Sequence, residues 1–232
     1  MTRCTAFLVV ASIAAIGMHA IGQVAAPATA APKAAAQQAP APTAGFTSLF
    51  DGRTLAGWGG DTQGYVVEDG AIKCTPAGRN LHTVGEYGDF HLKLQFKLAA
   101  GSNNGIGIRA PKDGDAAFEG MEIQVLDDTA EKWKDLKEWQ FCCSVYGVVP
   151  AHRGHLKPVG EWNEEEIIAK GSRITVKLNG HVVVDADVAE ASRGGTPDGR
   201  DHPGLKRTSG HIHFCGHGDP VWFRAIEIKE LK

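Results

Sequence analysis

Along most of the chain, apolar and polar residues alternate with a period of two. In residues 89–98 every second position is Phe or Leu, which predicts a long strand with one face in a hydrophobic core. The same alternation in residues 174–178 is followed by Asn179-Gly180, and Asp69-Gly70 separates two shorter apolar runs. Asn-Gly and Asp-Gly between such runs are typical of tight hairpin turns, so two β-hairpins are expected.

Further alternating or apolar runs predict strands at residues 105–109, 121–126, 145–149, 165–170, 210–215 and 221–229. Only residues 129–139 have a helical pattern, and we expect them to form an excursion between strands. Many strands without alternating helices predict an all-β fold with two antiparallel sheets packed as a sandwich. Immunoglobulin-like sandwiches need only about 100 residues, so the longer region 45–232 favours a jelly roll.

The N-terminal region has a different pattern. Arg3 precedes an apolar run at residues 6–16 that ends in small residues, which is typical of a signal peptide. The run is too short to span a membrane, which takes about 20 residues. We therefore expect a signal peptide ending near residue 26, a flexible Ala/Pro-rich tether at 27–44, and a folded domain at 45–232. The predicted location is periplasmic or extracellular, with no transmembrane segment after processing.

Charge and cysteine content narrow the picture further. The formal net charge of −3 leaves the folded region mildly acidic, which gives no broad surface for a phosphate backbone and argues against nucleic-acid binding. Four cysteines follow the signal peptide, among them the adjacent Cys142 and Cys143. In an extended segment these two would point to opposite faces. We expect at most one disulfide, to a distant partner, with buried free thiols as the alternative.

The run 121–128 carries the strongest candidate chemistry. Ile123 and Val125 would face the core, so Glu122 and Gln124 would share the opposite face. A bulge at residues 125–126 would bring Asp127 onto that face as well. Laminarinase-type glucanases line a sugar cleft with carboxylates from a similar strand, but a retaining glycosidase needs two carboxyl groups about 5 Å apart. A solvated polar strand face is the structural alternative.

Other polar residues are candidates for ligand binding. His211 and His213 would share a strand face, and His217 follows them in a glycine-flanked loop that allows close approach of a ligand. The amide of Asn104 and the guanidinium of Arg109 suit recognition of hydroxyl and carbonyl groups. Trp162 could stack on a sugar or belong to the core.

These residues lie in short motifs that agree, in order, with those of a known family. The motifs are Gly45-Phe-Thr-Ser-Leu-Phe-Asp-Gly-Arg-Thr-Leu-Ala-Gly-Trp58, Tyr87-Gly-Asp-Phe90, Asn104-Gly-Ile, Glu122-Ile-Gln-Val-Leu-Asp127, Val145-Tyr-Gly-Val, Gly160-Glu-Trp-Asn163, Asn179-Gly180, Gly204-Leu-Lys-Arg207, Ser209-Gly-His-Ile212 and His217-Gly-Asp-Pro-Val-Trp-Phe-Arg224. Residues 45–232 thereby resemble the 3-keto-glucoside 1,2-lyase / 3-keto-2-hydroxyglucal hydratase family. Segment 214–216 and the 129–139 insertion depart from its usual pattern.

The resemblance implies a concanavalin-like jelly roll that acts on an oxidised mono- or disaccharide. Elimination across C1–C2 needs a base, an acid and an electrophile for the enolate. Glu122 and His217 are expected to be the base and acid in either order. Binding roles fall to Asn104, Arg109, Gln124, Asp127, Tyr146, Trp162 and Arg224. No cofactor is certain; a divalent metal could replace Arg109 as electrophile. A non-catalytic carbohydrate-binding module and a conventional glycoside hydrolase remain alternatives.

Overall fold

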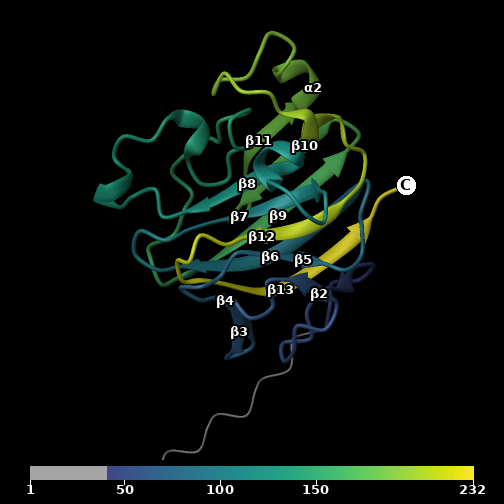
Figure 1. Ribbon diagram of the computed structural model, residues 1–232, viewed down its shortest axis with the longest axis vertical. Coiled ribbons are helices and arrows are strands. Elements are labelled where there is room, and N and C mark those ends of the chain that lie inside the picture. Colours follow the sequence, from purple (N-terminus) through teal and green to yellow (C-terminus); the bar gives the residue numbers. More distant parts are fainter. Residues whose placement is uncertain (1–40) are drawn as a thin grey trace, which may run out of the picture. The chain divides into compact units, whose positions relative to one another are not determined.

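Two antiparallel β-sheets packed face to face form the domain (Figure 1). The computed structural model describes residues 41–232; the predicted signal peptide and most of the predicted tether lie outside these residues. One sheet has the order β11 (His181–Asp187), β10 (Arg173–Leu178), β9 (Trp162–Lys170), β6 (Phe90–Leu98), β13 (Val221–Glu230), β4 (Ala71–Cys74) and β3 (Tyr65–Glu68), and β1 (Thr47–Ser48) pairs with β13. The other sheet has the order β2 (Trp58–Gly60), β5 (Asn80–Thr83), β12 (His211–Cys215), β7 (Asn103–Ala110) and β8 (Met121–Leu126). The predicted all-β, two-sheet jelly-roll sandwich is confirmed.

The core lies between the two sheets. The predicted alternation of β6 is complete, since its five apolar side chains are buried and the four polar ones between them are partly exposed. Across the core, the Phe214 ring of β12 stacks on the Phe223 ring of β13, with ring centroids 3.9 Å apart. The period-two pattern therefore determines which face of each strand points inward.

The two predicted hairpins are present. Asn179 and Gly180 connect β10 to β11 with φ of 51° and 84°. Asp69 and Gly70 connect β3 to β4 with φ of 50° and 74°. Positive φ at both central residues is the requirement of a type I′ turn, which Asn-Gly and Asp-Gly meet at low cost.

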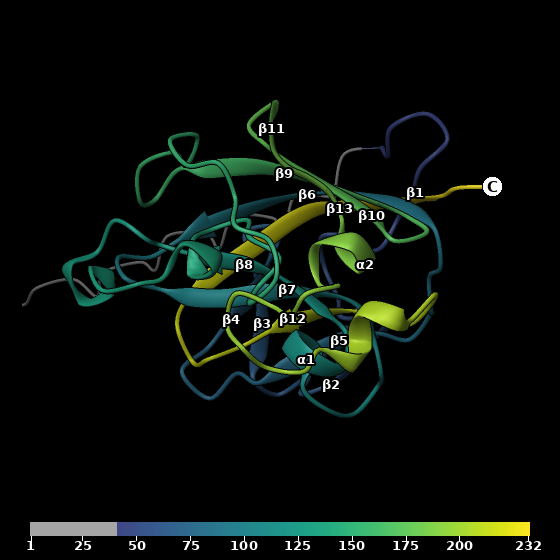
Figure 2. The ribbon, with the colours of Figure 1, turned by 90° about the horizontal axis from the view of Figure 1, so that it is seen from above.

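Within residues 41–232, helical structure is limited to short pieces between strands. These are α1 (Ala116–Glu119), α2 (Val188–Ala191) and the 3₁₀ turns η1 (Glu131–Trp133), η2 (Glu138–Gln140) and η3 (Pro203–Lys206). Figure 2 shows α1 on the side of β7 and β12 that faces away from β6 and β13. In the part of the chain described, no helix is long and apolar enough to cross a membrane.

Two sequence-based expectations about elements are wrong. Residues 145–149 form a tight turn closed by a hydrogen bond from Val145 N to Val149 O, with Gly147 at φ 75°. The turn takes the place of the predicted strand because the segment pairs with β8 only through an isolated bridge between Val145 and Ile123 and then folds back on itself. Residues 129–139 do form an excursion between strands, but with two 3₁₀ turns in place of a regular helix.

Candidate functional site

The outer face of the five-stranded sheet presents Glu122 and Gln124 from β8. Opposite them on β7 are Gly107 and Gly105, in an unbroken antiparallel register. A Cβ atom at Gly105 would lie 1.8 Å from Glu122 Oε1. The glycine therefore leaves the space in which the Glu122 carboxyl group lies across the neighbouring strand.

A cleft forms where this face meets the surrounding loops. Its cavity of about 300 Å³ is within the size range of small-ligand sites. The lining residues come from β7, β8, the α1 region, the 131–146 segment and the loop after β12: Asn103, Asp115, Ala117, Phe118, Glu122, Gln124, Leu126, Trp133, Leu136, Gln140, Tyr146 and His217. An adjoining depression shares Asp115, Ala117, Glu122 and His217 and adds Cys215. The structure thus brings Glu122, Gln124, Tyr146 and His217 together, as the sequence predicts.

Glu122 has the most perturbed charge state in the cleft. Burial, and secondly the nearby charge of Asp115, raise the pKa of Glu122 from 4.5 to about 8, against a smaller opposing contribution from the Cys215 thiol. Glu122 Oε1 is buried and has no hydrogen-bond partner within residues 41–232. The side chain is therefore a neutral acid at neutral pH, with a proton to donate.

His217 lies in the exposed loop between β12 and β13. Partial burial lowers its pKa below 6.5, although Asp219 and Asp115 act in the opposite direction. Its imidazole is consequently neutral at pH 7 and can accept a proton. A neutral acid and a neutral base on one cleft form a pair suited to proton transfer in both directions.

Gln124 and Tyr146 add hydrogen-bonding groups. Gln124 Oε1 accepts a hydrogen bond from Val125 N at 3.1 Å, which leaves its Nε2 hydrogens for a ligand. Tyr146 Oη accepts from Gln140 Nε2 at 3.5 Å, so its own hydroxyl hydrogen remains available.

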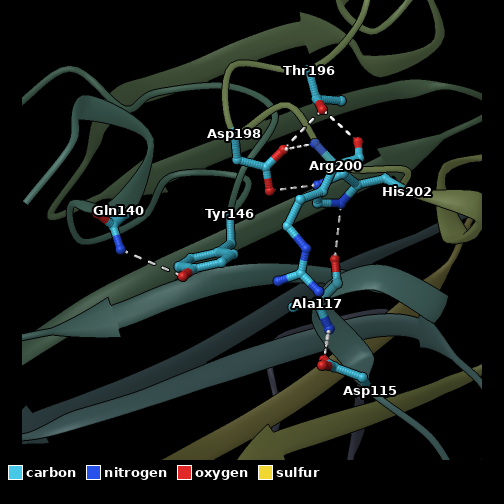
Figure 3. Close-up of polar contacts among 8 residues, drawn as sticks. All are labelled: Asp115, Ala117, Gln140, Tyr146, Thr196, Asp198, Arg200 and His202. Atoms are coloured by element: carbon cyan, nitrogen blue, oxygen red, sulfur yellow. Dashed lines mark hydrogen bonds and ion pairs between the residues drawn. The ribbon is translucent and has the colours of Figure 1, made fainter.

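A buried Asp–His pair holds the α1 wall of the cleft (Figure 3). His202 Nδ1 lies 3.1 Å from Ala117 O, and its Nε2 lies 3.0 Å from Asp198 Oδ2. Burial opposes ionisation of Asp198, but hydrogen bonds from Arg200 N, His202 and Thr196 together lower its pKa. The guanidinium of Arg200 also lies over the Phe118 ring, at 3.6 Å. The pair fixes the backbone that carries Ala117 and Phe118 into the cleft.

Two residues expected in the site are turned away from it. The β7–β8 register has no bulge, and the Asp127 carboxylate instead accepts hydrogen bonds from Gly101 N and from Thr129. It closes the loop between the strands. Asn104 pairs with Val125 and shares its core-facing side of the sheet. The adjacent Asn103 faces the cleft in its place, because neighbouring residues of a strand point to opposite sides.

Arg109 also lies outside the residues that line the cleft. Its buried guanidinium donates to Gly88 O at 2.9 Å and Gly171 O at 2.7 Å, and pairs with Asp89 Oδ1 at 2.9 Å. These contacts occupy its donors in joining the end of β7 to two loops.

Trp162 and Arg224 lie on the outer face of the eight-stranded sheet, which is the opposite layer. There the Arg224 guanidinium lies 3.9 Å from the Trp162 ring centroid and donates to Gln95 Oε1 at 2.7 Å. The strand register fixes this outcome, since Gln95 and Arg224 are paired between inward-facing neighbours. Neither residue reaches the cleft.

Comparison with known proteins matches residues 45–229 to the family model of the 3-keto-alpha-glucoside-1,2-lyase-like domain. The chain belongs to this family. A 3-keto-disaccharide hydrolase of Bacteroides thetaiotaomicron is 29% identical over 83% of this chain and 80% of its own length. Crystal structures of two candidate glycosyl hydrolases of Parabacteroides distasonis are also similar. One is 32% identical over 80% of this chain and 99% of its own, with a TM-score of 0.71. The other is 29% identical over 82% and 95%, with a TM-score of 0.70.

In this member of the lyase-like family, several cleft residues escape prediction from the sequence. Asp115, Phe118, Trp133, Leu136 and Gln140 all lie outside the strands, where no alternation indicates the direction of a side chain. Asp115 carries one local signal. It precedes α1 and caps it, since its Oδ1 accepts from Ala117 N at 3.0 Å.

The cleft residues of this family member do not fit a divalent metal. The carboxyl group of Glu122, whose pKa is raised to about 8 by burial, would have to lose its proton before it could bind a metal. In residues 41–232 no three His, Cys, Asp or Glu side chains are grouped as metal ligands. His211 and His213 do share a face, next to His82, but burial lowers the pKa of His213 to about 4. The His213 ring is therefore neutral at pH 7, and none of the three rings is among the residues that line the cleft.

Proposed function

We propose that this protein is an exported enzyme that cleaves 3-keto-glucosides by elimination across C1–C2 and hydrates the resulting 3-keto-2-hydroxyglucal. The net reaction is hydrolysis. The family and the 3-keto-disaccharide hydrolase relative support the substrate class. The observation that carries the proposal is the cleft itself, in which the neutral acid Glu122 and the neutral base His217 border one cavity.

The proposed chemistry begins with proton removal. A ketone at C3 acidifies the C2 proton, so His217 takes it as general base and an enolate develops. Asp115 and Asp219 favour the imidazolium form of His217 and so stabilise the base after it has accepted the proton. The Gln124 amide and the Tyr146 hydroxyl donate to the enolate and to the sugar hydroxyl groups.

Bond cleavage follows from protonation of the leaving oxygen. Glu122 donates its proton to the glycosidic oxygen, the C1–O bond breaks, and the electrons of the enolate form the C1–C2 double bond. For hydration, the resulting Glu122 carboxylate takes a proton from water as that water attacks C1, and His217 returns a proton to C2. Both groups end in their starting states, so the cycle needs no further reactant.

The first test compares a 3-keto-glucoside with its unoxidised parent, with release of the aglycone as the measurement. We expect cleavage of the oxidised sugar alone, since only the ketone makes the C2 proton removable. Equal rates on the two sugars would contradict elimination and favour a glycosidase that pairs Glu122 with Asp115. Binding without turnover of either sugar would indicate a carbohydrate-binding module.

Glu122→Gln separates the two steps. The variant keeps the shape of the side chain but has no proton to donate, so aglycone release should fall by roughly 10²–10⁴-fold. Exchange of the C2 proton with deuterated water, which depends on His217, should continue. Asp127→Asn is the matched control, because that carboxylate closes a loop outside the cleft. Loss of exchange and cleavage together in Glu122→Gln would reverse the assignment of acid and base.

A further inference from the structure

Cys142 and Cys143 form a close pair of adjacent thiols. Their Sγ atoms are 4.0 Å apart and both side chains are buried. The segment is not extended here, because Cys143 has φ of 69°, so the two side chains do not point to opposite faces as they would in a strand. This left-handed conformation, uncommon for a residue other than glycine, takes the backbone out of the extended form and brings the second thiol beside the first.

A buried carboxyl group lies behind the pair. Cys143 Sγ donates to Glu165 Oε1 of β9 at 3.5 Å, and Glu165 Oε2 has no hydrogen-bond partner in the described part of the chain. Burial raises the pKa of Glu165 to about 8. The pKa of Cys143 is raised by its contact with Cys142, by burial and by Glu165. Cys143 therefore resists ionisation, and the adjacent Glu165 can take its proton in the fraction that is ionised as pH rises toward 8.

Cys142 alone of the pair borders a cavity. This cavity, of about 300 Å³, lies beside the C-terminal ends of β8 and β10 and shares no lining residue with the cleft of Glu122. Asp128, His152, Arg153 and His155 are among its lining residues. A small reagent in the cavity meets the Cys142 thiol first, with Cys143 and Glu165 behind it.

We propose that Cys142 and Cys143 are a reversible thiol–disulfide switch, closed by a low-molecular-weight disulfide that enters this cavity. The inference does not depend on the proposed function. Cys142 attacks one sulfur of the reagent, which forms a mixed disulfide and releases one reagent thiol. Cys143 then passes its proton to the ionised fraction of Glu165, which grows as pH rises toward 8, and attacks the Cys142 sulfur. The second reagent sulfur leaves as a thiolate and takes a proton from water, and Glu165 returns its proton to solvent. The two protein thiols are oxidised, and the reagent is reduced to two thiols.

The geometry also makes the closed form easy to reopen. Adjacent Cα atoms are only about 3.8 Å apart, whereas ordinary disulfides join Cα atoms about 4.4–6.8 Å apart. Strained disulfides are readily reduced, which is typical of regulatory bonds. A backbone hydrogen bond links the pair to β8, the strand that carries Glu122, since Cys143 N donates to Gln124 O at 2.7 Å.

The test uses the full chain treated with oxidised glutathione, quenched with N-ethylmaleimide and digested with trypsin. Cleavage after Lys137 and Arg153 gives one peptide, residues 138–153, whose cysteines are Cys142 and Cys143 alone. We expect this peptide to carry no maleimide adduct. Its mass should be about 2 Da below that of the reduced peptide, since disulfide formation removes two hydrogens. Dithiothreitol should restore two maleimide adducts. A peptide that keeps two adducts, or that stops at a stable glutathione adduct, would overturn the proposal.

Single variants test the order of events. Cys143→Ser should accumulate the glutathione adduct on Cys142, and Cys142→Ser should remain unmodified. Glu165→Gln mimics the neutral acid that is present at neutral pH, so it preserves the fold while slowing the second step and prolonging the mixed disulfide. Cys74→Ser is the matched control, because Cys74 lies on β4 and does not line this cavity. Disulfide formation between Cys142 and Cys143 should proceed unchanged in this variant. Equal modification of Cys143 in Cys142→Ser would contradict the assigned roles.

Discussion

Glu122 acquires its chemistry from its surroundings. The same side chain in water would be ionised at pH 7, but here burial and the charge of Asp115 hold its pKa at about 8. Gly105 supplies the space for the carboxyl group, and the sheet itself supplies the burial. Acid function therefore depends on burial by the sheet and on a neighbouring negative charge as well as on the glutamate itself.

A pH–rate profile should report both proposed groups. Activity should fall as pH rises through about 8, because Glu122 then loses the proton it must donate. It should also fall below the ordinary range of a histidine, where His217 becomes protonated. The measurement is kcat/KM for a 3-keto-glucoside from pH 5 to pH 10. Each buffer is used within about one pH unit of its own pKa. An alkaline limb that persists in Glu122→Gln would assign it to another group.

How well the sequence predicts individual residues depends on strand register. Alternation placed Glu122 and Gln124 on one face correctly, because their apolar neighbours had to enter the core. The same rule excludes Asn104 and admits Asn103, but it could be applied only once the pairing with β8 was known. The prediction that Asp127 shares this face depended on an assumed bulge in β8. The regular β7–β8 register has no bulge, so Asp127 does not reach the cleft.

At the scale of elements, the 131–146 segment supplies side chains for the wall of the cleft, which the flat sheet cannot provide. It rises from the edge of β8 and places Trp133 and Tyr146 over the cleft, with Trp133 Nε1 donating to Gly101 O at 3.0 Å. Its conformation depends on contacts with other loops, which is why a helical pattern in the sequence gave short 3₁₀ turns. The strands form the floor of the cleft, and the loops form its walls.

Two tryptophan variants test this division. Trp133→Ala removes an aromatic wall, so KM for the 3-keto-glucoside should rise roughly 2- to 10-fold, the usual worth of an aromatic contact of about 0.5–1.5 kcal/mol. Trp162→Ala, on the other sheet, should leave kcat and KM unchanged. Steady-state kinetics of the two variants side by side is the measurement. A comparable rise in KM for Trp162→Ala would mean that the outer face of the eight-stranded sheet contacts substrate.

Across the whole molecule, the fold was more predictable than the site. Strand alternation and the two type I′ turns follow from short-range sequence patterns, and they determine the two sheets. Placement of Arg109, Trp162 and Arg224 relative to the cleft depends on which strands are neighbours across the sandwich. That arrangement is set by packing between segments distant in sequence, such as β6 between β9 and β13.

The buried Glu165 should make stability fall as pH rises. Its pKa is about 8 in the folded state and about 4.5 when unfolded, so the folded form holds a proton that the unfolded chain has lost. This contribution is complete below pH 4.5 and is lost as pH approaches 8, by about 1.4 kcal/mol per pH unit. Glu165→Gln should therefore be more stable than the wild type at pH 8 and similar at pH 5. Urea unfolding of the reduced proteins at both pH values is the measurement.

Glu122 has the same kind of shift, so the variant should reduce the pH dependence of stability without abolishing it. The Glu122→Gln variant is the natural control. The double variant should keep mainly the opposite dependence of His213, whose pKa of about 4 makes stability fall as pH drops below 6.5. Identical pH dependence in Glu165→Gln and the wild type would mean that Glu165 is ionised in the folded protein.

The absence of a side chain at position 105 gives a means of sorting relatives. A single methyl group there would meet the Glu122 carboxyl at 1.8 Å, so a homologue with alanine at the equivalent position must hold its glutamate differently. Glycine at the position of 105 together with glutamate at the position of 122 can thus serve as a two-residue criterion in sequence surveys. Chains that pass it are candidates for the same acid chemistry, and chains that fail it should be assayed for binding first.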